Sequence, residues 1–152
     1  GGGFVKISTK GRYALRLMTD VAVHGGEELV SLKDVAARQG ISMKYLEQIA
    51  GLLGKAGFLR SGRGALGGYR LTRPPEQYTL GSILRLTEGE LAPVACLETG
   101  ENTCERQDIC PTLGFWTGLY AVINEYVDRF TLADLVREEL EKSGISSAPP
   151  KV

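Results

Sequence analysis

The sequence predicts a mainly α-helical protein with a small β-hairpin, arranged as a winged helix-turn-helix followed by a long C-terminal dimerisation helix. Three observations support this fold class. Apolar residues recur at helical spacing in several segments, a glycine separates the second helix from the third, and a glycine-rich basic stretch joins two short apolar runs. With 152 residues, the chain can bury a core without disulfide bonds.

Three helices are expected in the first third of the chain, over residues 9–23, 32–39 and 43–56. The first has one apolar face and is followed by a His-Gly-Gly stretch that can end it. Ser31 and Ser42 are candidate N-caps of the second and third helices, because a serine hydroxyl can accept a hydrogen bond from a free N–H of the first turn.

The second and third helices have the spacing of a helix-turn-helix. Ala36 is small enough for a close helix crossing, and Gly40 can turn the chain with a positive φ. Leu46 and Ile49 can anchor the third helix on the core. A helical hairpin with a polar outer face is the alternative that this segment alone leaves open.

The outward positions of the third helix are candidate contacts to base edges or phosphates: Ser42, Lys44, Tyr45, Glu47 and Gln48. Gln48 can bind adenine through two hydrogen bonds, and Glu47 can accept one from the cytosine amino group. Lys44 and Tyr45 can reach phosphate or guanine.

Two short strands are expected at residues 57–61 and 69–72, joined by a glycine-rich loop at residues 62–68. The glycines allow this hairpin, or wing, to approach a sugar-phosphate backbone closely. Arg63 at its tip can enter a narrow minor groove, with a positive rim from Arg60, Arg70 and Arg73. A phosphate-binding loop of the nucleotide-hydrolase type is excluded, because no GK[ST] follows.

The net charge of zero is the sum of two oppositely charged halves. Residues 1–80 carry 12 Lys and Arg against 6 Asp and Glu, whereas residues 81–152 carry 6 against 12. The first half can therefore attract phosphate through counterion release, and the acidic second half is expected to stay away from a duplex.

The second half is expected to supply the dimer contact. Thr79 can cap a short helix over residues 80–87. Pro111 at a first helical position can open a long helix that reaches about residue 129. Thr131 with Asp134 can cap a last helix that reaches about residue 142. The long helix has a broad apolar stripe: Phe115, Trp116, Leu119, Val122, Ile123, Tyr126, Val127 and Phe130. We expect part of it to pair with a second subunit, because a two-fold operator requires a symmetric protein.

All three cysteines lie in one polar, acidic segment between the two helical regions. Cys96, Cys104 and Cys110 are separated by seven and five residues, and the segment has no helical or strand periodicity. Apolar burial and a disulfide framework explain them poorly. Soft thiolates on a short loop suit an iron-sulfur cluster or zinc.

Three separate segments, at residues 6–16, 39–48 and 67–71, resemble the Rrf2 family of bacterial transcriptional regulators, and the similarity runs from residue 6 to about residue 140. The resemblance implies a homodimer that binds a double-stranded DNA operator with two-fold symmetry. It implies base or backbone contacts from Ser42, Lys44, Glu47 and Gln48, with wing contacts from Arg63, Gly64 and Gly67. A glutamate at the position of Glu47 is linked in this family to the choice between operator types.

Within the family, the chain is most similar to the IscR-type members, which carry three cysteines at this place. This resemblance implies an iron-sulfur cluster, [2Fe-2S] in type, held by Cys96, Cys104 and Cys110. IscR-type sequences place a histidine ligand three residues after the third cysteine, where this chain has Leu113. Arg12 stands where some relatives have a ligating carboxylate, and His24 is expected in a solvated helix cap.

The fourth ligand therefore stays open. The candidates are the carboxylates of Glu98, Glu101, Glu105 and Asp108, or water or a small thiol. A weak fourth ligand would make a cluster labile, which suits a sensor.

The function predicted from these observations is a DNA-binding regulator, a repressor by type, of iron-sulfur cluster assembly genes that senses iron or redox state. The alternatives are a cluster-free or zinc-binding regulator of the same fold controlled by a protein partner, as in cysteine metabolism, and a redox protein. No enzyme is expected, because a single histidine lacks any surrounding catalytic motif.

The predicted organisation has four parts. Residues 1–5 read as a tag remnant, 6–78 as the DNA-binding domain, 79–142 as the cysteine loop and dimerisation helices, and 143–152 as a disordered tail. Because the apolar runs are far shorter than a membrane span requires, we expect a cytoplasmic protein that does not contact the membrane.

Overall fold

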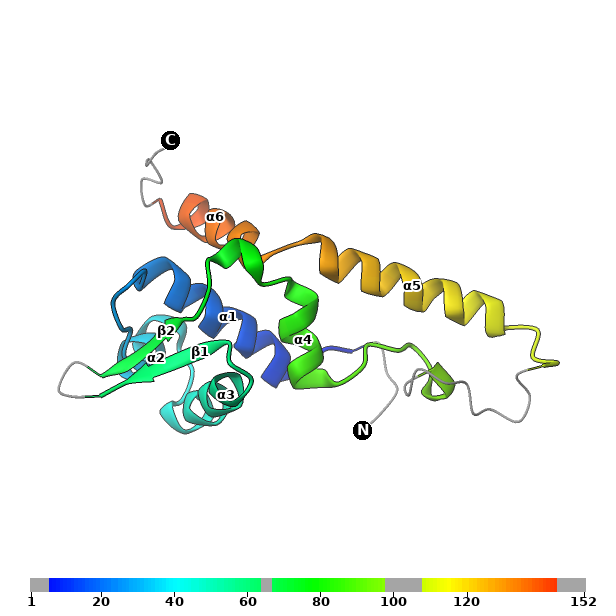
Figure 1. The fold of residues 1–152 in the computed structure, drawn as a ribbon, viewed down its shortest axis with the longest axis horizontal. Helices are drawn as coiled ribbons and strands as arrows, with labels where there is room; N and C mark the ends of the chain where they lie inside the picture. The colour runs from blue at the N-terminus through cyan, green and yellow to red at the C-terminus, as the bar shows by residue number, and fades with distance from the viewer. Residues whose placement is uncertain (1–5, 64–66, 98–107, 145–152) are drawn as a thin grey trace.

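The computed structural model of the chain describes residues 6–63, 67–97 and 108–144. Its elements, in chain order, are α1 (Thr9–His24), α2 (Leu32–Gln39), α3 (Met43–Lys55), β1 (Leu59–Gly62), β2 (Gly68–Leu71), the short 3₁₀ helix η1 (Pro75–Gln77), α4 (Leu80–Glu88), the short 3₁₀ helix η2 (Ala95–Leu97), α5 (Leu113–Arg129) and α6 (Leu132–Ser143). In Figure 1 the hairpin projects at one end of the molecule and α5 extends toward the other.

The caps predicted for the helix-turn-helix are confirmed. The Ser31 hydroxyl accepts a hydrogen bond from the Asp34 N–H at 3.1 Å, and the Ser42 hydroxyl accepts one from the Tyr45 N–H at 3.2 Å. Gly40 ends α2 with φ +67°, a left-handed conformation that glycine adopts at little cost. The turn between α2 and α3 is therefore encoded locally.

The hairpin is antiparallel, with Leu59 opposite Leu71 and Gly62 opposite Gly68. The expected start of the first strand at residue 57 is wrong. Gly57 adopts φ +81° and the Phe58 N–H still bonds to a carbonyl of α3, so the chain reaches extended conformation only at Leu59.

The core lies between α1, α2, α3 and the hairpin, and it also receives a residue from the far end of the chain. Ala14, Leu17, Leu46 and Leu53 are fully buried, and Leu132 of α6 joins them with no exposed surface. Helix α6 thus returns to pack on α1 (Figure 1). The core therefore joins residues of α1 and α6 that are about 120 positions apart in the sequence.

Backbone hydrogen bonds fix the return of the chain. The Leu80 N–H donates to the Phe130 carbonyl and the Leu132 N–H donates to the Tyr78 carbonyl, both at 2.9 Å. Thr79 caps α4 by accepting from the Ser82 N–H at 3.0 Å, as predicted. The segments before α4 and before α6 are therefore paired side by side.

The capping box predicted for the last helix is also confirmed. The Thr131 side chain accepts from the backbone of the third helical residue, and the Asp134 carboxylate accepts from the Thr131 N–H at 2.8 Å. This hydrogen bond, with help from Arg137, lowers the pKa of Asp134 below its usual value. The carboxylate therefore stays ionised at the positive end of the helix dipole.

Pro111 does not open the long helix, contrary to expectation. Helix α5 begins at Leu113, two residues later, and the Leu113 N–H faces the Cys110 carbonyl at 3.5 Å across a turn. The fixed φ of proline suits the second position of such a turn as well as the first position of a helix.

Candidate nucleic-acid interface

Helix α3 presents one polar side to solvent and one apolar side to the core. Lys44, Glu47 and Gln48 are exposed, whereas Leu46 and Ile49 have at most 1% of their surface exposed. Residues three and four positions apart share one side of a helix. The three polar side chains therefore form a continuous outward stripe, as the sequence predicted.

Ser42 and Tyr45 have structural roles beside any contact to a ligand. The Ser42 hydroxyl is exposed but is already engaged as the N-cap of α3. The Tyr45 ring is half-buried and packs edge-on against Tyr13 of α1, with the ring centroids 5.5 Å apart. Tyr45 therefore anchors the start of α3 on α1 and offers only part of its side chain to the outside.

A buried ionic network holds α2 against α1. Asp20 is 2% exposed and accepts hydrogen bonds from Arg38, the shortest at 2.7 Å, and from the Gln39 amide at 2.9 Å. The Asp20 hydrogen bonds raise the pKa of Arg38, which is ionised in any case. Arg16 in turn donates to the Gln39 side chain and carbonyl. This network holds Gln39, the last residue of α2 before the turn at Gly40, in place against α1.

The wing carries basic side chains, some of them exposed. Arg63 is exposed directly after β1, Gly67 is half-buried before β2, and Gly64 lies outside the described residues. Arg60 is exposed and lies directly opposite Arg70 across the hairpin. Like charges in this arrangement repel one another, so an anion bound between them would stabilise the pair.

Arg73 does not join the positive rim expected for the wing. Its guanidinium lies over two aromatic rings, 5.0 Å from the Phe58 centroid and 4.6 Å from the Tyr78 centroid. Such stacking binds the cation to the protein's own core. Arg73 therefore stabilises the base of the hairpin.

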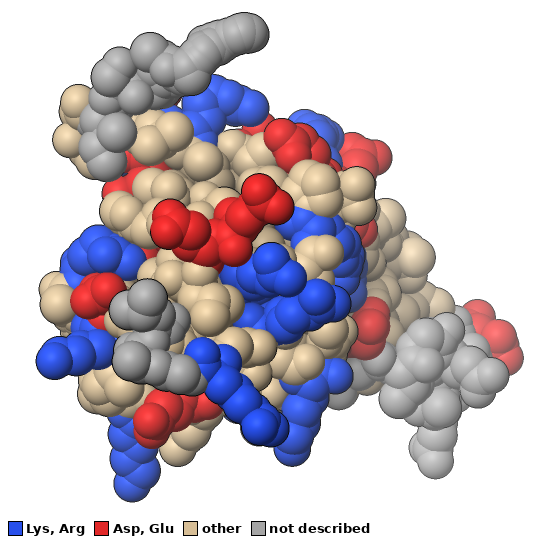
Figure 2. All heavy atoms as spheres, turned by 60° about the vertical axis from the view of Figure 1, so that its left-hand side comes forward, with Lys and Arg blue, Asp and Glu red and all other residues tan. Residues whose placement is uncertain are grey.

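The face of the molecule that includes the wing carries many Lys and Arg side chains (Figure 2), in agreement with the excess of basic residues in the first half of the chain. Figure 2 shows the face that includes the wing, where Lys and Arg side chains are spread over the surface and acidic groups are fewer. The exposed bases on α2, α3 and the hairpin include Lys33, Lys44, Arg60 and Arg63. A surface of this kind attracts a phosphate backbone.

The cysteine segment begins and ends at the other end of the molecule, beside the start of α5 (Figure 1). Cys96 lies in η2 and Cys110 precedes α5; both are half-buried, and the Cys110 sulfur lies 3.3 Å from the Thr112 hydroxyl. Cys104 lies outside the described residues, so the structure does not place all three thiols together.

The candidate fourth ligands are only partly placed. Asp108 is exposed, while Glu98, Glu101 and Glu105 fall outside the described residues. His24 is exposed at the end of α1. Among the residues that the structure places, no three His, Cys, Asp or Glu side chains come close enough to hold a metal ion. The donor chemistry of the two described thiols still fits iron-sulfur or zinc, since both favour thiolate sulfur.

A polar network joins α4 to α5. Arg85 donates to both carboxylate oxygens of Asp128 at 2.9 Å and to the Asn124 side chain at 2.8 Å. These bonds lower the pKa of Asp128 and raise that of Arg85. Further along, the Tyr120 hydroxyl donates to Glu90, which raises the pKa of Tyr120. The direction in which α5 leaves the body is therefore fixed by side-chain contacts.

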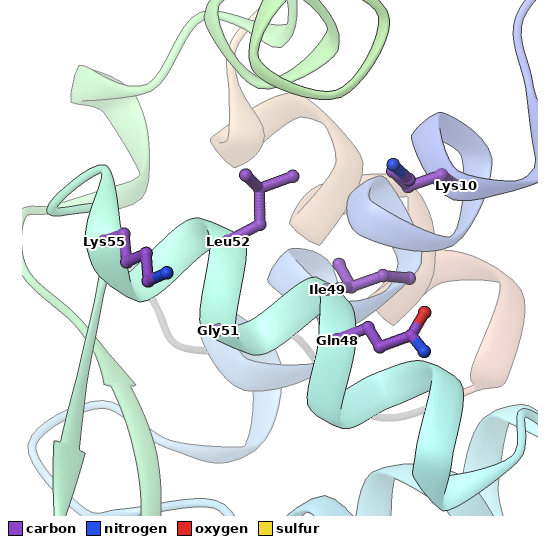
Figure 3. Close-up of a pocket in the computed structure, with 6 residues that line it drawn as sticks. All are labelled: Lys10, Gln48, Ile49, Gly51, Leu52 and Lys55. Carbon is purple, nitrogen blue, oxygen red and sulfur yellow. The ribbon is translucent and has the colours of Figure 1, made fainter.

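The structure adds four residues that the sequence analysis does not name: Lys10, Gly51, Leu52 and Lys55. A hollow of about 350 Å³ between α1 and α3 is lined by Lys10, Gln48, Ile49, Gly51, Leu52 and Lys55 (Figure 3). Gly51 and Lys55 continue the helical spacing of Lys44 and Gln48, and this spacing is the signal that could have identified them. Lys10 comes from another helix and carries no such signal.

Among the described residues, no helix has the length and apolar character needed to cross a membrane.

Residues 7–138 match the model of the family Rrf2, described as an iron-dependent transcriptional regulator. The protein rrf2 of Nitratidesulfovibrio vulgaris is 42% identical over 88% of this chain and 89% of its own length.

Two solved structures have similar folds. The structure of CymR, the global cysteine regulator of B. subtilis, is 40% identical with a TM-score of 0.71 and covers 88% of this chain and 97% of its own. The structure of T. potens IscR is 38% identical with the same TM-score and covers 97% and 93% of the two chains. The helix-turn-helix, the hairpin and the long helix thus occur together in known proteins.

Proposed function

Because this chain belongs to the Rrf2 family of transcriptional regulators, we propose that it acts as a homodimer that binds a two-fold symmetric DNA operator. The DNA-binding unit is residues 6–78, and α5 supplies the subunit contact. One observation carries the proposal: α3, with its exposed polar stripe, packs beside β1 of a hairpin that has exposed arginines at positions 60 and 63.

Helix α3 enters the major groove in this proposal. Gln48 and Glu47 read base edges, and Lys44 reaches guanine or phosphate. Ser42 and the exposed part of Tyr45 contact the backbone at the start of the helix. Their exposure, and the firm seating of α3 by Leu46 and Ile49, support these roles.

The wing contacts the adjacent minor groove. Arg63 inserts its guanidinium, and Gly64 and Gly67 allow the backbone of the wing to lie close to the sugar-phosphate chain. The exposure of Arg63 supports this role.

The dimer brings the two α3 helices to the two half-sites. Three large apolar side chains of α5 are exposed: Phe115 by 66%, Val122 by 63% and Tyr126 by 56%. A second copy of α5 would cover them, and a symmetric dimer matches a symmetric operator.

The cysteine loop is proposed to hold a [2Fe-2S] cluster through Cys96, Cys104 and Cys110. Such a group, when bound, would supply one-electron redox chemistry and a dependence on iron. The family description, iron-dependent transcriptional regulator, and the position of Cys96 and Cys110 at the two ends of one segment support this assignment.

Residues of this chain would transmit a change in the cysteine loop to the DNA-binding surface. Cys110 lies three residues before the start of α5, and Cys96 follows α4 by a short segment, so a change in the loop would reach both α4 and α5. We propose that the protein acts in the cytoplasm as a repressor of iron-sulfur cluster assembly genes, with the fourth ligand drawn from the loop carboxylates or solvent.

The DNA assignment is tested by fluorescence anisotropy with genomic fragments enriched by binding to the protein. We expect a salt-dependent affinity that Gln48→Ala lowers about tenfold on the selected sequence. Lys142→Ala, a charge change on α6, is the control and should leave the affinity unchanged. Equal binding of selected and scrambled duplexes by the parent would contradict the proposal.

The cluster assignment is tested by an absorbance spectrum with iron and sulfide counts on protein purified without oxygen. A visible chromophore with equal iron and sulfide, lost in Cys104→Ala, is expected. A colourless protein that resists reconstitution but still binds the operator would favour the partner-controlled type of regulator, of which the similar cysteine regulator is an example.

A further inference from the structure

The hollow between α1 and α3 has features of a binding site. Its floor is apolar, with Ile49 buried and Leu52 half-buried, and its rim is polar, with Lys10, Gln48 and Lys55 exposed. Figure 3 shows Lys10 on α1 across from Ile49 and Leu52, with Gln48 and Lys55 toward the two ends of the same stretch of α3.

The ammonium groups of the two lysines at the rim, Lys10 and Lys55, are available to bind an anion. In the described part of the chain, neither Lys10 nor Lys55 forms an ion pair within 4.0 Å. Glu88 interacts electrostatically with Lys10 but forms no ion pair with it, and its two carboxylate oxygens already accept hydrogen bonds from the Ser8 N–H and hydroxyl. The rim can therefore accept an anion.

Gly51 is the second, independent observation. It is exposed in the interior of α3, and a Cβ atom added there would meet no atom within 4 Å. Packing therefore does not require a glycine, although glycine weakens the interior of a helix. A glycine in such a place allows a ligand to approach the helix backbone closely.

The position of the hollow indicates the ligand. Lys44, Gln48, Gly51 and Lys55 follow one another at intervals of three and four residues along the exposed side of α3. The first two belong to the side that the proposed function directs into the major groove, so the next turns face the strand that borders this groove. A sugar-phosphate chain has an apolar sugar for the floor and a phosphate for the rim.

We propose that this hollow seats one sugar-phosphate unit of the bound DNA, with the deoxyribose on Leu52 and the phosphate between Lys10 and Lys55. Gly51 allows the backbone of the strand to reach α3. This inference rests on the proposed function, and it assigns Lys10, Gly51 and Lys55 as positioning residues that act on any DNA sequence.

The test uses the full chain and a labelled mixed-sequence duplex of about 30 base pairs, long enough for two half-sites, over a range of salt concentrations. Lys10→Ala and Lys55→Ala should each weaken binding about threefold to tenfold and reduce the slope of log affinity against log salt by about 1. Lys142→Ala removes the same charge far from the hollow and should change neither quantity.

Gly51→Ala separates a binding role from a structural one. The substitution should raise the melting temperature by about 1–3 °C while weakening DNA binding about threefold or more. Gly54→Ala is the matched control on the same helix: its Cβ would make only an ordinary contact at 3.9 Å, and it should leave DNA binding unchanged.

The outcomes are distinguishable. A parent protein that binds no duplex overturns the proposed function together with this inference. A parent that binds DNA while all three variants keep its affinity and salt slope overturns the inference alone. Saturable binding of inorganic phosphate at the hollow, with unchanged DNA affinity in the variants, identifies a free-anion site and also overturns it.

Discussion

The helix-turn-helix region and helix α5 contain similar apolar side chains but bury them very differently. Leu46, Ile49 and Leu53 are at most 1% exposed, whereas no residue of α5 is buried. The first region is completed by its own chain, including Leu132 of α6. Helix α5 leaves Phe115, Val122 and Tyr126 exposed, and no other segment in the described part of the chain covers them.

The largest effect is expected in the core of the first region. Leu46→Ala should lower the free energy of unfolding by about 2–5 kcal/mol, because the side chain has no exposed surface and its loss leaves a cavity. Chemical denaturation measures the change. A loss that disappeared at higher protein concentration would mean that this region also depends on the partner subunit.

The second prediction concerns α5. Val122→Asp should weaken dimerisation about 100-fold, because a carboxylate would be buried in an apolar interface. Sedimentation measures the monomer fraction across concentrations. Thr117→Asp places the same charge on a different side of α5, where the residue is exposed, and should have little effect. Equal dimerisation of all three proteins would exclude the α5 stripe as the subunit contact.

A smaller effect is expected where the two regions meet. Asp128→Asn removes the charge that pairs with Arg85, and because Asp128 is 44% exposed we expect a loss of about 1 kcal/mol or less. The hydrogen bonds from Arg85 lower the folded pKa of Asp128 below 3.8. Its contribution is therefore fully present above pH 3.8 and is lost as the pH falls through the folded pKa.

Acid titration of stability measures this contribution in the parent and in Asp128→Asn. The parent should lose more stability than the variant below pH 3.8. Arg129, which pairs with Glu125 on the exposed surface of α5, offers a control: Glu125→Gln should leave the acid limb close to that of the parent. If the free energy of unfolding fell equally with decreasing pH in the parent and in Asp128→Asn, the ion pair with Arg85 would not stabilise the junction between α4 and α5.

The smallest effect is expected at the N-terminus of α1. Glu88, the last residue of α4, accepts hydrogen bonds from the Ser8 N–H at 2.8 Å and from its hydroxyl. Although burial opposes ionisation, these bonds lower the pKa of Glu88. Glu88→Gln keeps an acceptor but removes the charge near the helix dipole, so we expect a loss of about 0.5 kcal/mol. Thermal unfolding measures it, with Glu27→Gln at an exposed residue after α1 as the reference; no difference between the two variants would contradict a role for the Glu88 charge.

The sequence by itself determined the features that depend on a few consecutive residues. Ser31, Ser42 and Thr79 cap helices where predicted, because a cap needs only a hydroxyl and the next turn of the chain. Gly40 makes the predicted turn for the same reason. The outward side of α3 also followed from spacing, since the period of a helix fixes which residues share a side.

Sequence reasoning failed where one local pattern fits two structures. Pro111 suits a turn as well as a helix start, and the tertiary path of the chain selected the turn. Arg73 was expected on the positive rim of the wing, but its guanidinium lies over the rings of Phe58 and Tyr78. Nothing in the local sequence indicates that these rings come together.

Only the tertiary structure decided the contacts between distant segments. Glu88 meets Ser8 across 80 residues of sequence, Leu132 completes the core beneath α1, and Lys10 reaches the floor formed by α3. Side-chain spacing within one element carries no information about which other element will pack against it. The hollow beside α3 therefore became visible only once the helices were packed, and so did the members of the predicted α5 stripe that stay exposed.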